Sequence, residues 1–75
     1  MRGYVLVNAR PGEEREIVSQ IRGVPGIVRA DVTFGPYDVI VEVQASDLAS
    51  LGKLVYGTIR ATPGVLDTLT CLAVE

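Results

Sequence analysis

Two spacings of apolar residues alternate along the chain. Stretches rich in β-branched residues, typical of strands, are separated by stretches in which apolar residues recur every three or four positions, typical of helices. The pattern predicts the order strand, helix, strand, strand, helix, strand. The four predicted strands cover residues 4–9, 27–34, 38–45 and 65–74.

Turn and capping residues mark where these elements end. The first helix is expected to begin within Pro11–Glu14, because proline fits the first helical turn and acidic side chains favour the positive end of the helix dipole. It should end at Gly23–Gly26. Ser46-Asp47 should cap the second helix and Pro63-Gly64 should stop it. Gly35-Pro36-Tyr37 is expected to form the hairpin between the two central strands.

The chain contains an internal repeat with an offset of 38 positions. Residues 21–28, IRGVPGIV, return as residues 59–66, IRATPGVL, with Ile, Arg, Pro and Gly in register. Each copy follows a predicted helix and leads into a predicted strand, so half of a split βαβ unit occurs twice. The order βαββαβ on one antiparallel sheet, with both helices on one face, is the ferredoxin-like α+β sandwich.

The alternation of side chains within the strands predicts which residues lie on each face of this sheet. One face should meet the helices through Val5, Val7, Ala9, Val39, Val41 and Val43. The other face should then be polar, but it contains Leu6 and Ile40, and the last strand is apolar at both parities. A sheet that is apolar on both faces is normally buried on both. We therefore expect the open face to pack on a second subunit and form a dimer.

Size and composition also favour self-association. A core in a 75-residue chain supplies only about 3–5 kcal/mol, and one cysteine with no histidine offers neither a disulfide nor a typical metal site. With 48% hydrophobic residues and a mean hydropathy of +0.34, the chain is rich in apolar surface. Its net charge of −2 argues against direct nucleic-acid binding. The sequence has neither a membrane-length apolar run nor a signal peptide, so we expect a cytoplasmic protein.

Little in the chain suggests catalysis. Without histidine, neither a Ser–His nor a Cys–His nucleophile can be built, and Cys71 is interpreted as a buried structural residue of the last strand. We expect no catalytic residue, metal or cofactor. The glutamates at positions 13, 14 and 16 are interpreted as a solvated helix turn. Asp38 follows the hairpin directly, where it could meet a partner or accept hydrogen bonds from turn N–H groups.

The hairpin and the last strand resemble a known family. Residues 35–43, GPYDVIVEV, followed after a helix by residues 62–70, TPGVLDTLT, resemble the ligand-sensing half of the Lrp/AsnC transcription regulators, also called the RAM domain. The resemblance covers essentially the whole chain. Full-length members carry an N-terminal helix-turn-helix that this sequence does not show. We therefore expect residues 1–75 to be a single, stand-alone RAM domain, with no DNA-binding domain and no direct operator binding.

The resemblance implies a non-enzymatic amino-acid sensor that modulates transcription. In the family, sheets pair into dimers, dimers assemble into rings, and an amino-acid effector binds between dimers; a partner here could be a full-length Lrp/AsnC regulator. Carried over, the ligand-binding residues are Gly35, Tyr37, Asp38, Thr68 and Thr70. The resemblance suggests that Asp38 pairs with the ligand ammonium, while turn N–H groups and threonine hydroxyls hold its carboxylate. The two threonines could equally be ordinary strand residues.

Two alternatives remain open from the sequence. The chain could be a small enzyme of the dimeric α+β-barrel type, although it offers only Tyr4 and Asn8 on the first strand as polar groups over the sheet. It could also be a structural adaptor that lends its sheet to a full-length regulator and binds no ligand.

Overall fold

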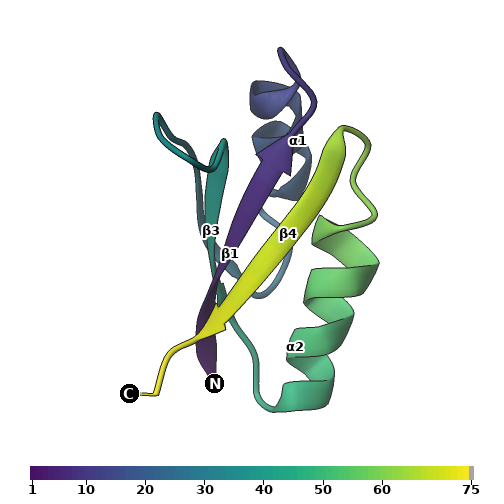
Figure 1. Ribbon diagram of the computed structural model, residues 1–75. Coiled ribbons are helices and arrows are strands. Elements are labelled where there is room, and N and C mark those ends of the chain that lie inside the picture. Colours follow the sequence, from purple (N-terminus) through teal and green to yellow (C-terminus); the bar gives the residue numbers. More distant parts are fainter. Residues whose placement is uncertain (75) are drawn as a thin grey trace.

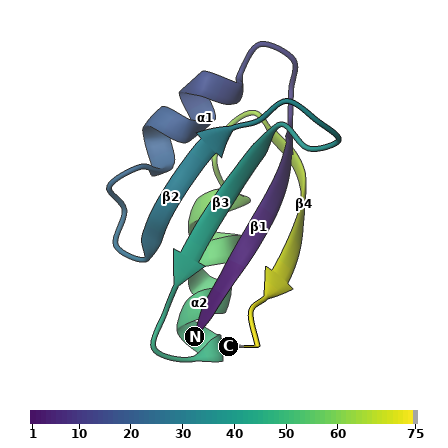
Figure 2. The ribbon, with the colours of Figure 1, turned by 90° about the vertical axis from the view of Figure 1, so that its left-hand side faces the viewer.

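The predicted order of strands and helices is confirmed in the computed structural model, which describes residues 1–74; Glu75, the last residue of the predicted domain, lies outside the described residues. Four antiparallel strands form one sheet in the order β2-β3-β1-β4, and both helices cover the same face (Figures 1 and 2). This is the ferredoxin-like sandwich. The elements are β1 (Arg2–Ala9), α1 (Glu14–Ile21), β2 (Ile27–Val32), β3 (Val39–Gln44), α2 (Leu48–Leu54), the π-helical turn η1 (Val55–Ile59) and β4 (Val65–Leu72).

The boundaries differ from the expected ones where a turn or a strand partner intervenes. α1 begins at Glu14 because Pro11-Gly12 forms a turn in which Gly12 has a φ of 88°. β1 begins at Arg2, since Arg2 still pairs with Gln44 of β3. The predicted cap of the second helix is confirmed: the Asp47 side chain accepts the Ser50 N–H at 2.7 Å, and this bond lowers the pKa of Asp47.

The core lies between the helices and the face of the sheet that the alternation predicted. Its most deeply buried side chains come from all three of β1, β2 and β3 and from the helices, and they are 0–2% exposed: Val5, Val7, Ile17, Ile21, Ala30, Val39, Val41, Val43, Leu51 and Ile59. Because α1 and α2 with η1 cover only this face, the other face of the sheet remains uncovered (Figure 2).

The open face is apolar in one row and polar around it. Leu6 pairs with Ile40 of β3 and with Leu69 of β4, so these three side chains form a continuous row across the sheet. Ile40 is 36% exposed and Leu69 49% exposed. Tyr4 lies beside this row, and polar residues flank it, namely Asn8, Arg29, Asp31, Glu42 and Asp67. The second face is therefore less uniformly apolar than the alternation predicted.

A bulge corrects the prediction for the last strand. The register shifts between Asn8 and Ala9, so Val65 pairs with Ala9 and faces the helices, whereas Leu69 faces the open side. Simple alternation puts Val65 and Leu69, four positions apart, on one face, because the extra residue of a bulge is not visible in a period of two. The interpretation of Cys71 as buried is also wrong: it is exposed, and it pairs with Tyr4 on the open face.

The two copies of the sequence repeat form equivalent hydrogen bonds. In the first copy, Val24 N–H donates to the carbonyl of Ile21 at 3.2 Å; in the second, Thr62 N–H donates to the carbonyl of Ile59 at 3.1 Å. The two turn glycines have the same backbone, with φ of 97° at Gly26 and 96° at Gly64. The repeated Pro-Gly therefore builds the same turn twice.

Each turn binds the opposite half of the chain. The carbonyl of Gly26 accepts the N–H of Gln44 at 2.8 Å, and the carbonyl of Gly64 accepts the N–H of Arg10 at 2.7 Å. A Cβ on Gly26 would lie 2.8 Å from Leu54 Cδ2, and one on Gly64 would lie 2.7 Å from Glu13 Oε1. Both turns therefore require glycine for their backbone. Gly26 also requires it for packing, because the Gln44 carbonyl lies 3.1 Å from the same Cβ position. At Gly64 the nearest atom is the end of the flexible Glu13 side chain.

Within residues 1–74, no helix combines the length and the apolar character that crossing a bilayer demands.

Substitutions at Gly23 and Gly26, which lie in one loop, separate the effect of backbone conformation from the effect of packing. Gly23 has a φ of 86° and open space around it, so Gly23→Ala should cost only the backbone strain, about 1–2 kcal/mol. Gly26→Ala adds the clash with Leu54 and should cost about 1–3 kcal/mol more. Chemical denaturation of both variants measures the difference. Equal losses would contradict the packing requirement at Gly26.

Candidate functional site

Three connections gather at the end of the sheet farthest from both termini: the β1–α1 loop, the β2–β3 hairpin and the turn before β4 (Figure 1). Backbone hydrogen bonds tie them together. Arg10 N–H donates to the carbonyl of Gly64, and Asp38 N–H donates to the carbonyl of Val7 at 2.9 Å. The hairpin that the sequence singled out therefore stands beside the start of α1.

Asp38 has a structural bond at this end. Its Oδ2 accepts the N–H of Ala9 at 2.7 Å, while its backbone carbonyl accepts the N–H of Thr33 at 2.9 Å. The hydrogen-bonding role considered for Asp38 is thus present, although the donor is the end of β1 and not the hairpin turn itself. Among the described residues, none donates a hydrogen bond to Oδ1, so half of the carboxylate is available to a further partner.

The tip of the hairpin is held by one side chain and is otherwise open. Thr33 Oγ1 donates to the carbonyl of Tyr37 at 2.7 Å, and Tyr37 as a whole is half-buried. Gly35 has no heavy atom within 4 Å of the place where a Cβ would be, and its φ is not in the left-handed region. Glycine is therefore not needed at position 35 for the fold, and it leaves the backbone accessible.

A hollow of about 660 Å³, the hairpin hollow, lies beside this tip. It is lined by Glu14, Val32, Thr33, Phe34, Gly35 and Asp38. The structure thus brings together two of the predicted ligand residues, Gly35 and Asp38. The lining contains two carboxylates and no basic side chain, so it favours a cation such as an ammonium group.

Glu14 is the lining residue that sequence reasoning missed. It had been grouped with Glu13 and Glu16 as a solvated turn, but it is half-buried and has no hydrogen bond or ion pair with any described residue. Glu13 instead pairs with Arg10 at 3.5 Å, and Glu16 accepts a hydrogen bond from Gln20. The available signal was topological: in βαββαβ, the start of the first helix and the central hairpin share one end of the sheet.

Thr68 and Thr70 lie elsewhere. They pair with Val7 and Val5 of β1, so they share the helix-bearing face of the sheet, and β1 separates them from β3. Thr68 is half-buried and Thr70 is exposed, and neither lines the hairpin hollow. One protomer therefore does not bring the five predicted ligand residues into a single hollow.

The residues considered for an enzyme have ordinary surroundings. Asn8 Nδ2 donates to Asp67 Oδ1 at 2.9 Å, and Tyr4 lies on the open face between Glu42 and Cys71. In the part of the chain that the structure describes, no group of three or more His, Cys, Asp or Glu side chains could hold a metal ion.

Known proteins with related sequences are transcription regulators and an enzyme. An uncharacterised helix-turn-helix-type transcriptional regulator of Pyrococcus furiosus is 27% identical over 73 residues, which cover 93% of this chain and 49% of that protein. The chain thus spans about half the length of this curated regulator. A homocitrate synthase of Saccharolobus islandicus is 40% identical over 58 residues, which cover 77% of this chain but only 12% of the enzyme.

Solved structures share the fold over nearly the whole chain. A hypothetical protein from Pyrococcus horikoshii superposes with a TM-score of 0.91 and 30% identity, covering 99% of this chain and 89% of that one. A transcriptional regulator of Neisseria meningitidis, solved as a complex with L-Met, superposes with a TM-score of 0.86. Its 18% identity, over 99% of this chain and 49% of that one, establishes likeness of fold alone.

The family comparison covers the same span as the fold. Residues 2–75 match the family model described as the Lrp/AsnC ligand binding domain. Because this match takes in every strand and helix of the sandwich, together with the hairpin hollow, the chain belongs to the Lrp/AsnC ligand-binding domain family.

Proposed function

We propose that this chain is a non-enzymatic sensor that binds an amino acid at its hairpin end and passes the binding event to a transcription regulator. The observation that carries the proposal is the hairpin hollow, in which two carboxylates without a basic neighbour stand beside an open glycine backbone. Glu14 and the free Oδ1 of Asp38 pair with the ligand ammonium. Membership in a ligand-binding family and the L-Met complex of a protein with the same fold support an amino acid as the ligand.

The ligand carboxylate requires groups from outside the hollow. No cationic side chain lines it, so the carboxylate is held by backbone N–H groups near Gly35 and by threonine hydroxyls. Thr68 and Thr70 of the same protomer lie across β1 from the hairpin, which favours a neighbouring protomer as the source of the hydroxyls. The complete site then lies between subunits, and ligand and assembly favour each other by linkage.

The open face of the sheet provides the first level of assembly. The row Leu6, Ile40 and Leu69 is apolar and uncovered, and a second copy packed on it removes this row from water. The hairpin hollow is lined from α1 and the β2–β3 connection and not by this row, so dimers formed in this way keep the hollow available for contacts between dimers in a larger ring.

The output of the sensor requires another protein. Curated relatives carry this module as about half of a helix-turn-helix regulator or as a small part of a homocitrate synthase, which supports a general role as a sensing unit attached to different outputs. We infer that this chain acts in the cytoplasm through a partner such as a full-length Lrp/AsnC regulator. The chain has a net charge of −2 and therefore lacks the excess of positive charge that binding to DNA phosphates requires.

Leu6→Lys tests the dimer. A lysine at the centre of the apolar row would be buried without a partner, so the dimer should weaken at least about tenfold, or the chain should aggregate. Leu48→Lys is the matched control, because Leu48 is 61% exposed at the start of α2, away from the open face. Analytical ultracentrifugation measures both. A well-folded 8 kDa monomer of the parent at micromolar concentration would contradict the proposed assembly.

Glu14→Gln and Asp38→Ala test the ligand site. A thermal-shift screen over the common amino acids first finds the ligand, which at 100 times its Kd stabilises the protein by about 2.7 kcal/mol. Glu14→Gln should then weaken binding about tenfold without unfolding the chain, since Glu14 bonds to no described residue. Asp38→Ala should cost about 2–4 kcal/mol of binding.

The matched control for these two variants is Glu16→Gln, which removes a carboxylate of the same helix that bonds to Gln20 and lies outside the hollow. Calorimetry on all three gives the affinities, and sizing with and without ligand gives the assembly. Unchanged affinity in both Glu14→Gln and Asp38→Ala would exclude the hairpin hollow. If Asp38→Ala unfolds the chain while Glu14→Gln binds normally, Asp38 is a structural residue only.

A further inference from the structure

A second hollow lies between α1 and the edge strand β2, and it shares only Val32 with the hairpin hollow. This α1–β2 groove has a volume of about 540 Å³ and is lined by Arg15, Val18, Ser19, Arg22, Asp31 and Val32. Its polar residues on the helical segment, at positions 15, 19 and 22, follow the spacing i, i+4, i+7, which puts them on one face of a helix. The proposed amino-acid site uses none of these three.

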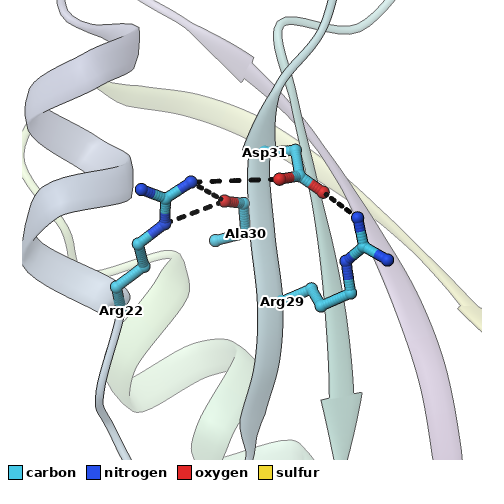
Figure 3. A network of polar contacts seen from close by, with 4 residues as sticks. All are labelled: Arg22, Arg29, Ala30 and Asp31. Atoms are coloured by element: carbon cyan, nitrogen blue, oxygen red, sulfur yellow. Dashed lines mark hydrogen bonds and ion pairs between the residues drawn. The ribbon is translucent and has the colours of Figure 1, made fainter.

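Arg22 is fixed in this groove by the backbone of β2. Its Nε and Nη2 both donate to the carbonyl of Ala30, at 3.1 Å and 2.7 Å, and Figure 3 shows the side chain reaching from the end of α1 to the strand. These two bonds hold the guanidinium in one orientation and leave Nη1 without a bond to any described residue. The side chain is 62% exposed, so an incoming ligand can reach it.

Arg15 and Ser19 add unused donors. Neither side chain makes a hydrogen bond or an ion pair with a described residue, yet both line the same groove as Arg22. The one carboxylate present, Asp31, lies 3.9 Å from Arg22 and 3.4 Å from Arg29, which approach it from two sides (Figure 3). The groove lining holds two arginines, Arg15 and Arg22, against the single carboxylate of Asp31, with which Arg29 also pairs from outside the groove. The lining is therefore positive, although the chain as a whole has a net charge of −2.

The internal repeat provides a comparison within the same molecule. The positions equivalent to Arg15, Ser19 and Arg22 in the second half are Lys53, Gly57 and Arg60. There, Arg60 stacks over the ring of Tyr56 at 5.0 Å, and Lys53 lines a different hollow that does not include Arg60. Among the described residues of the second half, Lys53 and Arg60 therefore do not meet in one hollow as Arg15 and Arg22 do in the first.

We propose that the α1–β2 groove is a binding site for an oxyanion, the carboxylate or phosphate group of a small metabolite, which is held by Arg15, Arg22 and the Ser19 hydroxyl. Arginine donates to such groups with charge-assisted hydrogen bonds, and a guanidinium already fixed by Ala30 loses little freedom when it binds. Its binding groups are distinct from those of the hairpin hollow, although Val32 lines both, so the protein would respond to two chemically different ligands.

Titration of the whole chain with inorganic phosphate, followed by two-dimensional nitrogen–proton NMR, tests the site. The Arg22 Nε–H, which donates to Ala30, is a direct reporter, and the amides of Val18 and Ser19, which line this groove and not the hairpin hollow, are others. Their signals should shift along a saturable curve that sodium chloride at matched ionic strength does not reproduce. Acetate in place of phosphate separates the two sources of oxyanion: saturation by both indicates a general site, and saturation by phosphate alone indicates a phosphate ester.

Matched variants assign the contribution of each charge. Arg15→Gln removes a side chain without a partner, so it should leave the fold intact and weaken phosphate binding about three- to tenfold. Lys53→Gln and Arg60→Gln remove the repeat-equivalent charges and should leave the affinity unchanged. The proposal is overturned if phosphate and chloride give the same unsaturated shifts at all arginines, or if Arg15→Gln binds phosphate as tightly as the parent.

Discussion

The two Pro-Gly turns join the two halves of the chain, because each turn accepts a backbone hydrogen bond from the opposite half. Gly26 belongs to the first half of the chain and accepts a hydrogen bond from the end of β3, and Gly64 belongs to the second half and accepts one from the end of β1. Neither half can place its helix without the other, because each glycine also packs against the opposite half. The start of α1, which provides Glu14, is positioned by the second of these contacts.

The geometry of the candidate site depends on these hydrogen bonds between the two halves. Arg10 is tied to Gly64 and Ala9 to Asp38, so the connection into α1 is bound on one side by the turn before β4 and on the other by the hairpin. The carboxylates of Glu14 and Asp38 then line the same hollow, with Asp38 held by its bond to Ala9 and Glu14 carried on the fixed start of α1. An acidic hollow that the fold itself fixes needs little reorganisation to accept an ammonium group.

Most of the fold could be predicted from the residues, and the failures have identifiable causes. The repeated Pro-Gly gave the turns, and the alternating valines of β1 and β3 gave the buried face, because both depend on local geometry. The face of Val65 could not be found, since the bulge inserts a residue into a period of two. Cys71 lies in the regularly paired part of β4, and it is exposed because the helices leave its face of the sheet uncovered. Glu14 was missed because helical spacing gives the phase of a side chain but not the loop opposite it. Gly35 and Asp38 line one hollow because they belong to the same hairpin, whereas Thr68 and Thr70 pair with Val7 and Val5 on the helix-bearing face and lie outside it.

The bond between Arg22 and Ala30 also bears on how the protein avoids unwanted polymers. β2 is an edge strand, and the carbonyl of Ala30 meets a guanidinium instead of β3, so it points outward from the sheet. An outward carbonyl on an exposed edge is the group onto which a foreign strand would add, as in fibril growth. With that acceptor occupied and a positive charge beside it, this edge of the sheet is a poorer template for a foreign strand.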